Sequence, residues 1–145
     1  MSIPAILVIE DNFADVTLLN MAFEGLGIDY KLEVLSDGEA ALTYIADRRT
    51  GRRESAPCVI LLDLYLPKYN GIEVLNAIRR DPVLSDVHVI IFTSLARPDD
   101  LAEISSLGAL LRKKPSDLKG FCDLAGEIIA LCHSPSPDNV EASHA

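Results

Sequence analysis

A short apolar run that ends in an acidic residue constrains the fold of this chain more than any other feature. Residues 59–62, Val-Ile-Leu-Leu, form an unbroken hydrophobic segment, which is typical of a strand covered by helices on both faces of a parallel sheet. Asp63 follows directly. Ligands gather at the carboxyl ends of strands in open α/β sheets, so Asp63 is a candidate site residue. An Asp in this position can equally start a turn, and the rest of the chain has to decide between the two.

Apolar runs alternate with helix signals along the chain. Strands are expected at residues 5–9, 30–35, 59–62, 87–92 and 109–112. Helices are expected after Asn12, at 40–48, at 72–80, from Pro98 to Gly108, and at 117–133. Five strands that alternate with five helices predict a doubly wound α/β fold, with a five-stranded parallel sheet and helices on both faces.

Capping residues mark the expected helix ends. Asn12 and Ser116 are expected to cap the first and last helices, and Ser36 with Glu39 forms a capping box for the second. Pro98 suits the first turn of the fourth helix. Asn12, Ser36 and Ser116 should each accept a hydrogen bond from a free N–H group in the first turn of the helix that follows.

Length and charge limit the classes of function. The 145 residues suffice for one domain, expected at 4–133, and leave no room for a second folded module. A formal net charge of −9 disfavours binding to nucleic acid or to anionic membranes. The N-terminus lacks a basic leader and its apolar run is five residues long, so neither a signal peptide nor a membrane anchor is expected. Residues 134–145, rich in Pro, Ser and charge, are expected to form a disordered tail.

The three cysteines show no pattern of a disulfide framework or a zinc site. Cys58, Cys122 and Cys132 are odd in number, lack C-x-x-C spacing and stand among apolar residues. We therefore expect reduced packing residues rather than disulfides or zinc ligands, and a cytoplasmic location.

A polar loop at residues 49–57 carries most of a basic cluster, and both a solvated loop and a docking patch for an acidic partner remain open. The cluster consists of Arg48, Arg49, Arg52 and Arg53.

Polar side chains follow four of the predicted strands. They are Glu10 and Asp11, Asp63, Thr93, and Lys114. Parallel strands share one carboxyl edge, so these side chains are expected to lie together. Three neighbouring carboxylates repel unless a cation joins them, and oxygen ligands suit Mg²⁺ or Mn²⁺. The metal and the lysine could neutralise charge on a phosphoryl group, and Thr93 could donate a hydrogen bond to it. Asp63 could then attack as a nucleophile and form an aspartyl phosphate.

The same residues carry a family resemblance. The motifs EDN at Glu10, DLYLPKYNG at Asp63, TS at Thr93 and KP at Lys114 resemble, in kind and order, those of receiver domains of two-component response regulators, the CheY-like superfamily. The resemblance covers about residues 4–133. It implies a flavodoxin-like (βα)5 fold with strand order 2-1-3-4-5, and a protein that accepts a phosphoryl group from a histidine kinase without being a turnover enzyme.

The resemblance also implies the metal ligands. Asp11 and Asp63 would bind Mg²⁺ directly, Glu10 would bind it through water, and the carbonyl of Tyr65 would complete the set. Asp63 would be the phosphoacceptor. Tyr65 is also the residue two positions beyond Asp63, where by analogy a bulky side chain obstructs hydrolytic water.

The switch residues resemble the family only in part. Thr93 and Lys114 correspond to the switch hydroxyl and the phosphate-binding lysine, with a cis bond expected before Pro115. The usual switch aromatic would fall near Leu111 or Arg112, so an aromatic switch is not expected. Leu95 stands two positions beyond Thr93, and its bulk together with that of Tyr65 predicts slow loss of phosphate.

The implied partners are proteins. The EDNFAD start and the long loop before residue 59 resemble regulators that partner bacterial phytochromes and related sensor histidine kinases. A downstream phosphotransfer protein is a further candidate partner, and no DNA-binding output domain is expected.

The last helix has two apolar stripes. One is expected to cover the sheet: Leu118, Cys122, Ala125, Ile129 and Cys132. The other predicts a homodimer surface: Phe121, Leu124, Ile128 and Leu131. The alternative is one broad apolar face that is buried deeply in the protomer.

Three other classes are less consistent with these motifs. A metal-dependent phosphatase with an aspartyl nucleophile usually needs a second acid where Tyr65 stands. A nucleotide-binding domain would need a G-x-G-x-x-G or Walker loop after the first strand. A degenerate receiver that acts purely through protein contacts is disfavoured by the complete set of acids, Thr93 and Lys114.

Overall fold

The computed structural model describes residues 3–49 and 56–133, and the predicted tail lies outside them. The strands are β1 (Ala5–Ile9), β2 (Lys31–Leu35), β3 (Val59–Leu62), β4 (His88–Thr93) and β5 (Leu110–Lys113). They are parallel and form one sheet in the order β2-β1-β3-β4-β5. The helices are α1 (Phe13–Gly25), α2 (Gly38–Arg49), α3 (Gly71–Arg80), α4 (Pro98–Ser106) and α5 (Leu118–Cys132). The doubly wound fold and its strand order are confirmed.

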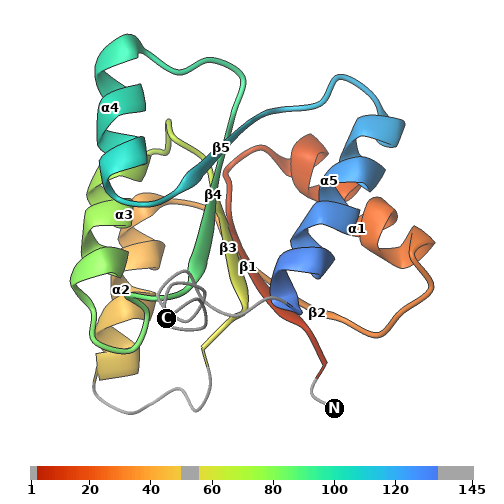
Figure 1. Cartoon of the computed structure of the whole chain (residues 1–145), viewed down its shortest axis with the longest axis horizontal. Helices are drawn as coiled ribbons and strands as arrows, with labels where there is room; N and C mark the ends of the chain where they lie inside the picture. Colours follow the sequence, from red (N-terminus) through yellow and green to blue (C-terminus); the bar gives the residue numbers. More distant parts are fainter. Residues whose placement is uncertain (1–2, 50–55, 134–145) are drawn as a thin grey trace, which may run out of the picture.

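Helices cover both faces of the sheet. Figure 1 shows α2, α3 and α4 on one side and α1 with α5 on the other. Alternate residues of β3 therefore enter two separate cores: Ile60 and Leu62 pack toward the three-helix side, and Val59 and Leu61 toward α1 and α5. All four are buried, as expected for a central strand of a parallel sheet.

The two predicted apolar stripes of α5 form one broad face that packs in a single core, which is the alternative that the sequence left open. Ala125, from the stripe expected on the sheet, is buried there as well. Phe121, Leu124 and Ile128, assigned to a dimer surface, are buried in the core shared with α1 and the sheet. The ring of Phe121 lies edge-on to Phe92 of β4, with 6.0 Å between ring centroids. Leu131 packs against the same core. The prediction that this stripe forms a dimer surface is wrong, because α5 directs it at the sheet and at α1.

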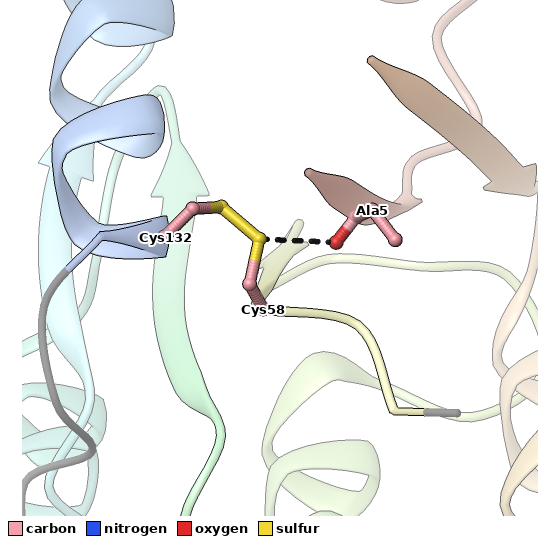
Figure 2. The surroundings of a disulfide bond; sticks show 3 residues. All are labelled: Ala5, Cys58 and Cys132. Atoms are coloured by element: carbon pink, nitrogen blue, oxygen red, sulfur yellow. Dashed lines mark hydrogen bonds between the residues drawn. A yellow bond between two sulfur atoms is a disulfide. The ribbon is translucent and has the colours of Figure 1, made fainter. Parts of the chain in front are cut away.

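Two of the three cysteines form a disulfide, contrary to the expectation from sequence. Cys58, just before β3, is bonded to Cys132, the last residue of α5, with 5.1 Å between their Cα atoms (Figure 2). The two are 74 positions apart, so their spacing gives no sign of the contact that the packing of α5 creates. Cys122 is a free thiol. The disulfide also removes the cysteine argument for a cytosolic location.

The Ala5 carbonyl oxygen lies 3.3 Å from the Cys58 sulfur (Figure 2). A disulfide sulfur carries no hydrogen, so this contact is a hydrogen bond only in the reduced protein.

The helix caps confirm some sequence signals and correct others. Asn12 accepts a hydrogen bond from the Asp15 N–H (3.1 Å), as predicted. For α2 the cap is Asp37, which accepts from the Ala40 N–H, and for α5 it is Asp117. Ser36 and Ser116 are each one residue too early, because the carboxylate nearer the helix reaches the free N–H groups.

Three other expectations are settled or fall outside the structure. Among the described residues no peptide bond is cis, so the bond before Pro115 is trans. Arg48 is buried on α2 and belongs to no exposed basic patch, while Arg52 and Arg53 lie outside the described residues. Within residues 3–49 and 56–133, none of the helices has the length and apolar character needed to span a membrane.

Candidate functional site

Strand register brings the predicted site residues to one edge of the sheet. Ile9 pairs with Leu62, so Glu10 and Asp63, the residues that follow, stand side by side. The Asp63 N–H donates to the Ile9 carbonyl (2.9 Å), which extends the β1–β3 ladder into the site. At the far side, the Lys114 N–H donates to the carbonyl of Thr93 (2.9 Å). The backbone therefore aligns the ends of β1, β3, β4 and β5.

Three carboxylates form the centre of this edge. Glu10, Asp11 and Asp63 each offer an oxygen, and these oxygens lie within 4.8 Å of one another. Glu10 and Asp63 are almost fully buried, with 1% and 6% of their surfaces exposed, whereas Asp11 is exposed. Like charges at this spacing suit a hard divalent cation with oxygen ligands, and the exposed side leaves room for its waters. The residues present therefore fit a divalent metal.

Backbone N–H groups orient the two buried carboxylates. The Asn12 N–H donates to Oε1 of Glu10 (3.0 Å), and the Tyr65 N–H donates to Oδ1 of Asp63 (3.2 Å). The remaining oxygen of each carboxylate lies near the Lys114 ammonium, at 2.9 Å for Glu10 and 3.4 Å for Asp63. Each carboxylate is thus held in a defined orientation between the backbone and one cation.

Lys114 has a third partner that the sequence did not reveal. Its Nζ lies 2.8 Å from Oδ2 of Asp15, in the first turn of α1. The ammonium also lies 5.2 Å from the centre of the Phe92 ring. The available signal was the position of Asp15 in the first turn of the helix that Asn12 caps, directly after the acidic end of β1.

The enclosure shifts two pKa values. Burial raises the pKa of Glu10 to about 8, against the opposing effects of Lys114 and the Asn12 N–H. For Lys114, burial acts to lower the pKa, but the hydrogen bonds to Asp15 and Glu10 outweigh it and leave the pKa above the usual range for lysine. Lys114 therefore stays cationic at neutral pH.

Thr93 ends β4 and is buried beside the acidic centre. Its hydroxyl donates to the carbonyl of Leu95 (3.2 Å), within its own loop. Leu95 itself is 74% exposed. The structure thus places Thr93 at the predicted edge, with its hydroxyl bonded to the loop that precedes α4.

The position of the usual switch aromatic is occupied by a salt bridge. The Arg112 guanidinium meets the Glu127 carboxylate of α5 in two contacts, Nε to Oε1 at 2.9 Å and Nη2 to Oε2 at 2.6 Å. Leu111 packs against the core under α4. Neither side chain is aromatic, as the sequence indicated.

A glycine keeps the loop after β3 close to the following helix. The Gly71 N–H donates to the Leu64 carbonyl (2.7 Å). A Cβ on Gly71 would lie 2.5 Å from the Asp63 carbonyl oxygen and 2.7 Å from Cα of Leu64. Only glycine allows this approach, which holds the backbone of Asp63 against α3.

A five-stranded 2-1-3-4-5 sheet with buried acids and a lysine at its carboxyl edge defines the receiver class. The family model described as the response regulator receiver domain matches residues 6–119. The chain therefore belongs to the response regulator receiver family.

Two curated relatives illustrate the range of this family. The probable methanogenesis regulatory protein FilR2 of Methanothrix harundinacea is 45% identical over 96 residues, which cover 66% of this chain and 61% of FilR2. The response regulator Rcp1 of a Synechocystis strain is 36% identical over 96 residues, 66% of this chain and 65% of Rcp1. The aligned region thus spans somewhat less than two thirds of each relative.

Solved structures agree over nearly the whole chain. The Mn²⁺-bound form of Rcp1 superposes with a TM-score of 0.78 at 31% identity, covering 92% of this chain and 99% of that one. The phosphorylated cyanobacterial phytochrome response regulator RcpA superposes with a TM-score of 0.82 at 28% identity, covering 94% and 99%. This chain is therefore a receiver-domain response regulator similar to phytochrome response regulators.

Proposed function

We propose that this response regulator accepts a phosphoryl group on Asp63 from the phosphohistidine of a sensor histidine kinase, and signals through protein contacts that depend on phosphorylation. The observation that carries the proposal is the placement of Asp63. Its carboxylate is buried beside two further acids, with Oδ2 3.4 Å from the Lys114 ammonium. A nucleophile, a cationic partner and a metal-binding cluster would then share one edge of the sheet.

The transfer forms one bond and breaks one. An Asp63 carboxylate oxygen attacks phosphorus, the P–N bond to the kinase imidazole breaks, and its electron pair returns to that nitrogen. Lys114 neutralises charge on the phosphoryl oxygens, and the Tyr65 N–H keeps the Asp63 carboxylate oriented through Oδ1. Thr93 would release the Leu95 carbonyl and donate its hydroxyl to the phosphoryl group.

Mg²⁺ is the proposed resident ion, with Mn²⁺ as a substitute. Glu10, Asp11 and Asp63 would hold it, together with the Tyr65 carbonyl. When bound, the ion supplies positive charge that offsets the charge of the transferred group. The cluster of oxygens and the Mn²⁺-bound form of the similar regulator Rcp1 support this assignment.

The proposed kinase is one of the bacterial phytochrome type. The support is the similarity to Rcp1 and to the solved structures of two phytochrome response regulators, RcpA and RtBRR. Because such a kinase draws on cellular ATP, the proposed location is the cytoplasm. Residues 4–133 would form the receiver domain, and a phosphotransfer protein is a candidate recipient of the phosphoryl group.

A small phosphodonor tests the chemistry without knowledge of the kinase. Acetyl phosphate and Mg²⁺ should give a base-labile adduct on the wild-type protein and none on Asp63→Asn, with chelation of the metal abolishing it. The matched control is Asp99→Asn, since Asp99 is an exposed acid in the first turn of α4. Absence of the adduct from the wild type would reject the proposal in favour of a degenerate receiver that acts by protein contacts alone.

A further inference from the structure

The edge of the sheet holds a fourth carboxylate that the phosphotransfer chemistry leaves without a role. Asp15 Oδ2 lies 2.8 Å from Lys114 Nζ, the shortest of the three carboxylate contacts of that ammonium. The side chains of Asp15 and Lys114 are 17% and 13% exposed, so the pair is largely shielded from water. Asp15 comes from α1, whereas the other acids around Lys114 follow strands.

We propose that Asp15 is a positioning residue that competes with the phosphoryl group for Lys114 and thereby limits how much phosphorylated protein accumulates. This inference rests on the proposed function, because it concerns the same lysine and the same Asp63.

The first argument is the number of hydrogen-bond donors. An ammonium group has three N–H donors, and in this structure three carboxylates surround it: Asp15, Glu10 and Asp63. Lys114 Nζ donates hydrogen bonds to Asp15 Oδ2 and Asp63 Oδ2, while Glu10 Oε2 makes only an ionic contact, so a closer contact with a phosphoryl group on Asp63 draws the ammonium away from Asp15. Asp63 has the longest contact, at 3.4 Å, whereas Asp15 is closer and holds the ammonium toward α1.

The second argument is charge. Phosphorylation of Asp63 replaces one negative charge by a group that carries about two. Asp15 shares the Lys114 ammonium with Asp63, so part of its positive charge is already neutralised and less of it is available to the added negative charge. A neutral amide in place of Asp15 weakens the hold on Lys114 and leaves more of its charge for the phosphoryl group.

The third argument is that Asp15 is fixed in place. Its N–H donates to Oδ1 of Asn12, and α1 packs against the sheet through Leu19 and Phe23. Its carboxylate therefore cannot follow the lysine far toward Asp63, and any gain in the contact between lysine and phosphate lengthens the contact with Asp15.

The test compares Asp15→Asn with the wild type in acetyl phosphate and Mg²⁺. Asp15→Asn should raise the steady-state phosphorylated fraction and lengthen the half-life of the adduct after donor removal. The ratio of phosphorylated to unphosphorylated protein at steady state should rise about three- to tenfold, which corresponds to one partly buried charge interaction. Glu73→Gln is the matched control, because Glu73 stands at the same position of α3, with its N–H bonded to Asn70 Oδ1 (3.0 Å), and is exposed.

Combining Asp15→Asn with Lys114→Met separates an effect exerted through Lys114 from a general effect on the fold. In Lys114→Met the substitution Asp15→Asn should leave the residual phosphorylation level unchanged, because the proposed competition needs the ammonium. Asp15→Ser, which keeps a side chain suited to the start of a helix, repeats the test if the amide variant unfolds.

The outcomes distinguish this inference from the function it rests on. A wild-type protein without any adduct removes both. A phosphorylated wild type whose Asp15→Asn and Asp15→Ser variants accumulate equal or less adduct overturns only the role of Asp15. Persistence of the increase in Lys114→Met also overturns that role, since the effect would then be independent of the lysine.

Discussion

The Tyr65 hydroxyl donates a hydrogen bond to Oδ2 of Asp100 (3.3 Å), which joins the loop after Asp63 to the first turn of α4. The Arg97 guanidinium lies over the Tyr65 ring, 5.8 Å from its centre. The backbone N–H of Tyr65 meanwhile donates to Asp63 Oδ1. A single residue therefore contacts the proposed nucleophile and the start of α4, in a protein that lacks the usual aromatic on β5.

Loss of the Tyr65–Asp100 hydrogen bond should shorten the life of the aspartyl phosphate. Tyr65→Phe and Asp100→Ala each free the ring to move, so water reaches the acyl phosphate more often, and we expect decay to accelerate about twofold to fivefold, the worth of one hydrogen bond. Decay of the adduct after removal of acetyl phosphate measures this. Replacing both bulky residues, in Tyr65→Asn with Leu95→Glu, should accelerate decay further.

Tyr69→Phe is the control for these variants, because Tyr69 is as exposed as Tyr65 and stands in the same loop. Equal decay rates for Tyr65→Phe, Asp100→Ala and the wild type would contradict the role of the hydrogen bond.

The stability of the metal-free protein should fall as pH rises from about 5 to 8. The pKa of Glu10 is raised from 4.5 to about 8 by burial, so over this range the folded protein holds a proton that the unfolded chain has lost. The free energy of unfolding then decreases with pH, by at most about 1.4 kcal/mol per pH unit. Urea unfolding in the presence of a chelator at several pH values measures the slope.

Glu10→Gln should flatten that pH dependence, since the amide does not titrate. Saturating Mg²⁺ should weaken it as well, because the ion and the proton compete for the same carboxylate. A slope that is identical in Glu10→Gln would show that another group binds the proton.

Reduction of the disulfide should lower the free energy of unfolding. The bond closes a loop between residues 74 positions apart, and chain-entropy arguments assign roughly 4 kcal/mol to a loop of that length. Denaturant unfolding with and without a thiol reductant measures the difference, and Cys58→Ser and Cys132→Ser should match the reduced protein. Cys122→Ser, which removes the free thiol, should keep the full sensitivity to the reductant. Insensitivity of the wild type would argue against the bond in solution.

Gly71→Ala should destabilise the fold and reduce phosphorylation together. Its Cβ would meet the backbone of Asp63 and Leu64 at 2.5 Å and 2.7 Å, so the loop that carries the nucleophile has to shift, at a cost of about 1–3 kcal/mol. Gly126→Ala is the comparison, because a Cβ there meets nothing within 4 Å and alanine favours a helix by about 0.5–1 kcal/mol. Thermal unfolding and adduct formation are the readouts, and equal behaviour of the two variants would count against the close approach.

Part of the site could be predicted because it depends on local pattern and on one rule of topology. Glu10, Asp63 and Lys114 each follow an apolar run, and parallel strands place the ends of such runs on one edge. Their meeting within 3.4 Å agrees with that reasoning. Asp15 was missed because it lies on a helix, where only the packing of α1 against the sheet brings its side chain to Lys114.

The sequence by itself determined the alternation of strands and helices, the strand boundaries to within about a residue, and the polar groups that end each strand. Those properties arise from the spacing of apolar residues and from capping chemistry, which act between near neighbours. Only the tertiary structure decided that both apolar stripes of α5 pack in one core, that Cys58 meets Cys132, and that Asp15 reaches a lysine 99 positions away. These contacts depend on how helices rotate and shift as they pack on the sheet. The spacing of residues along the chain does not determine that rotation.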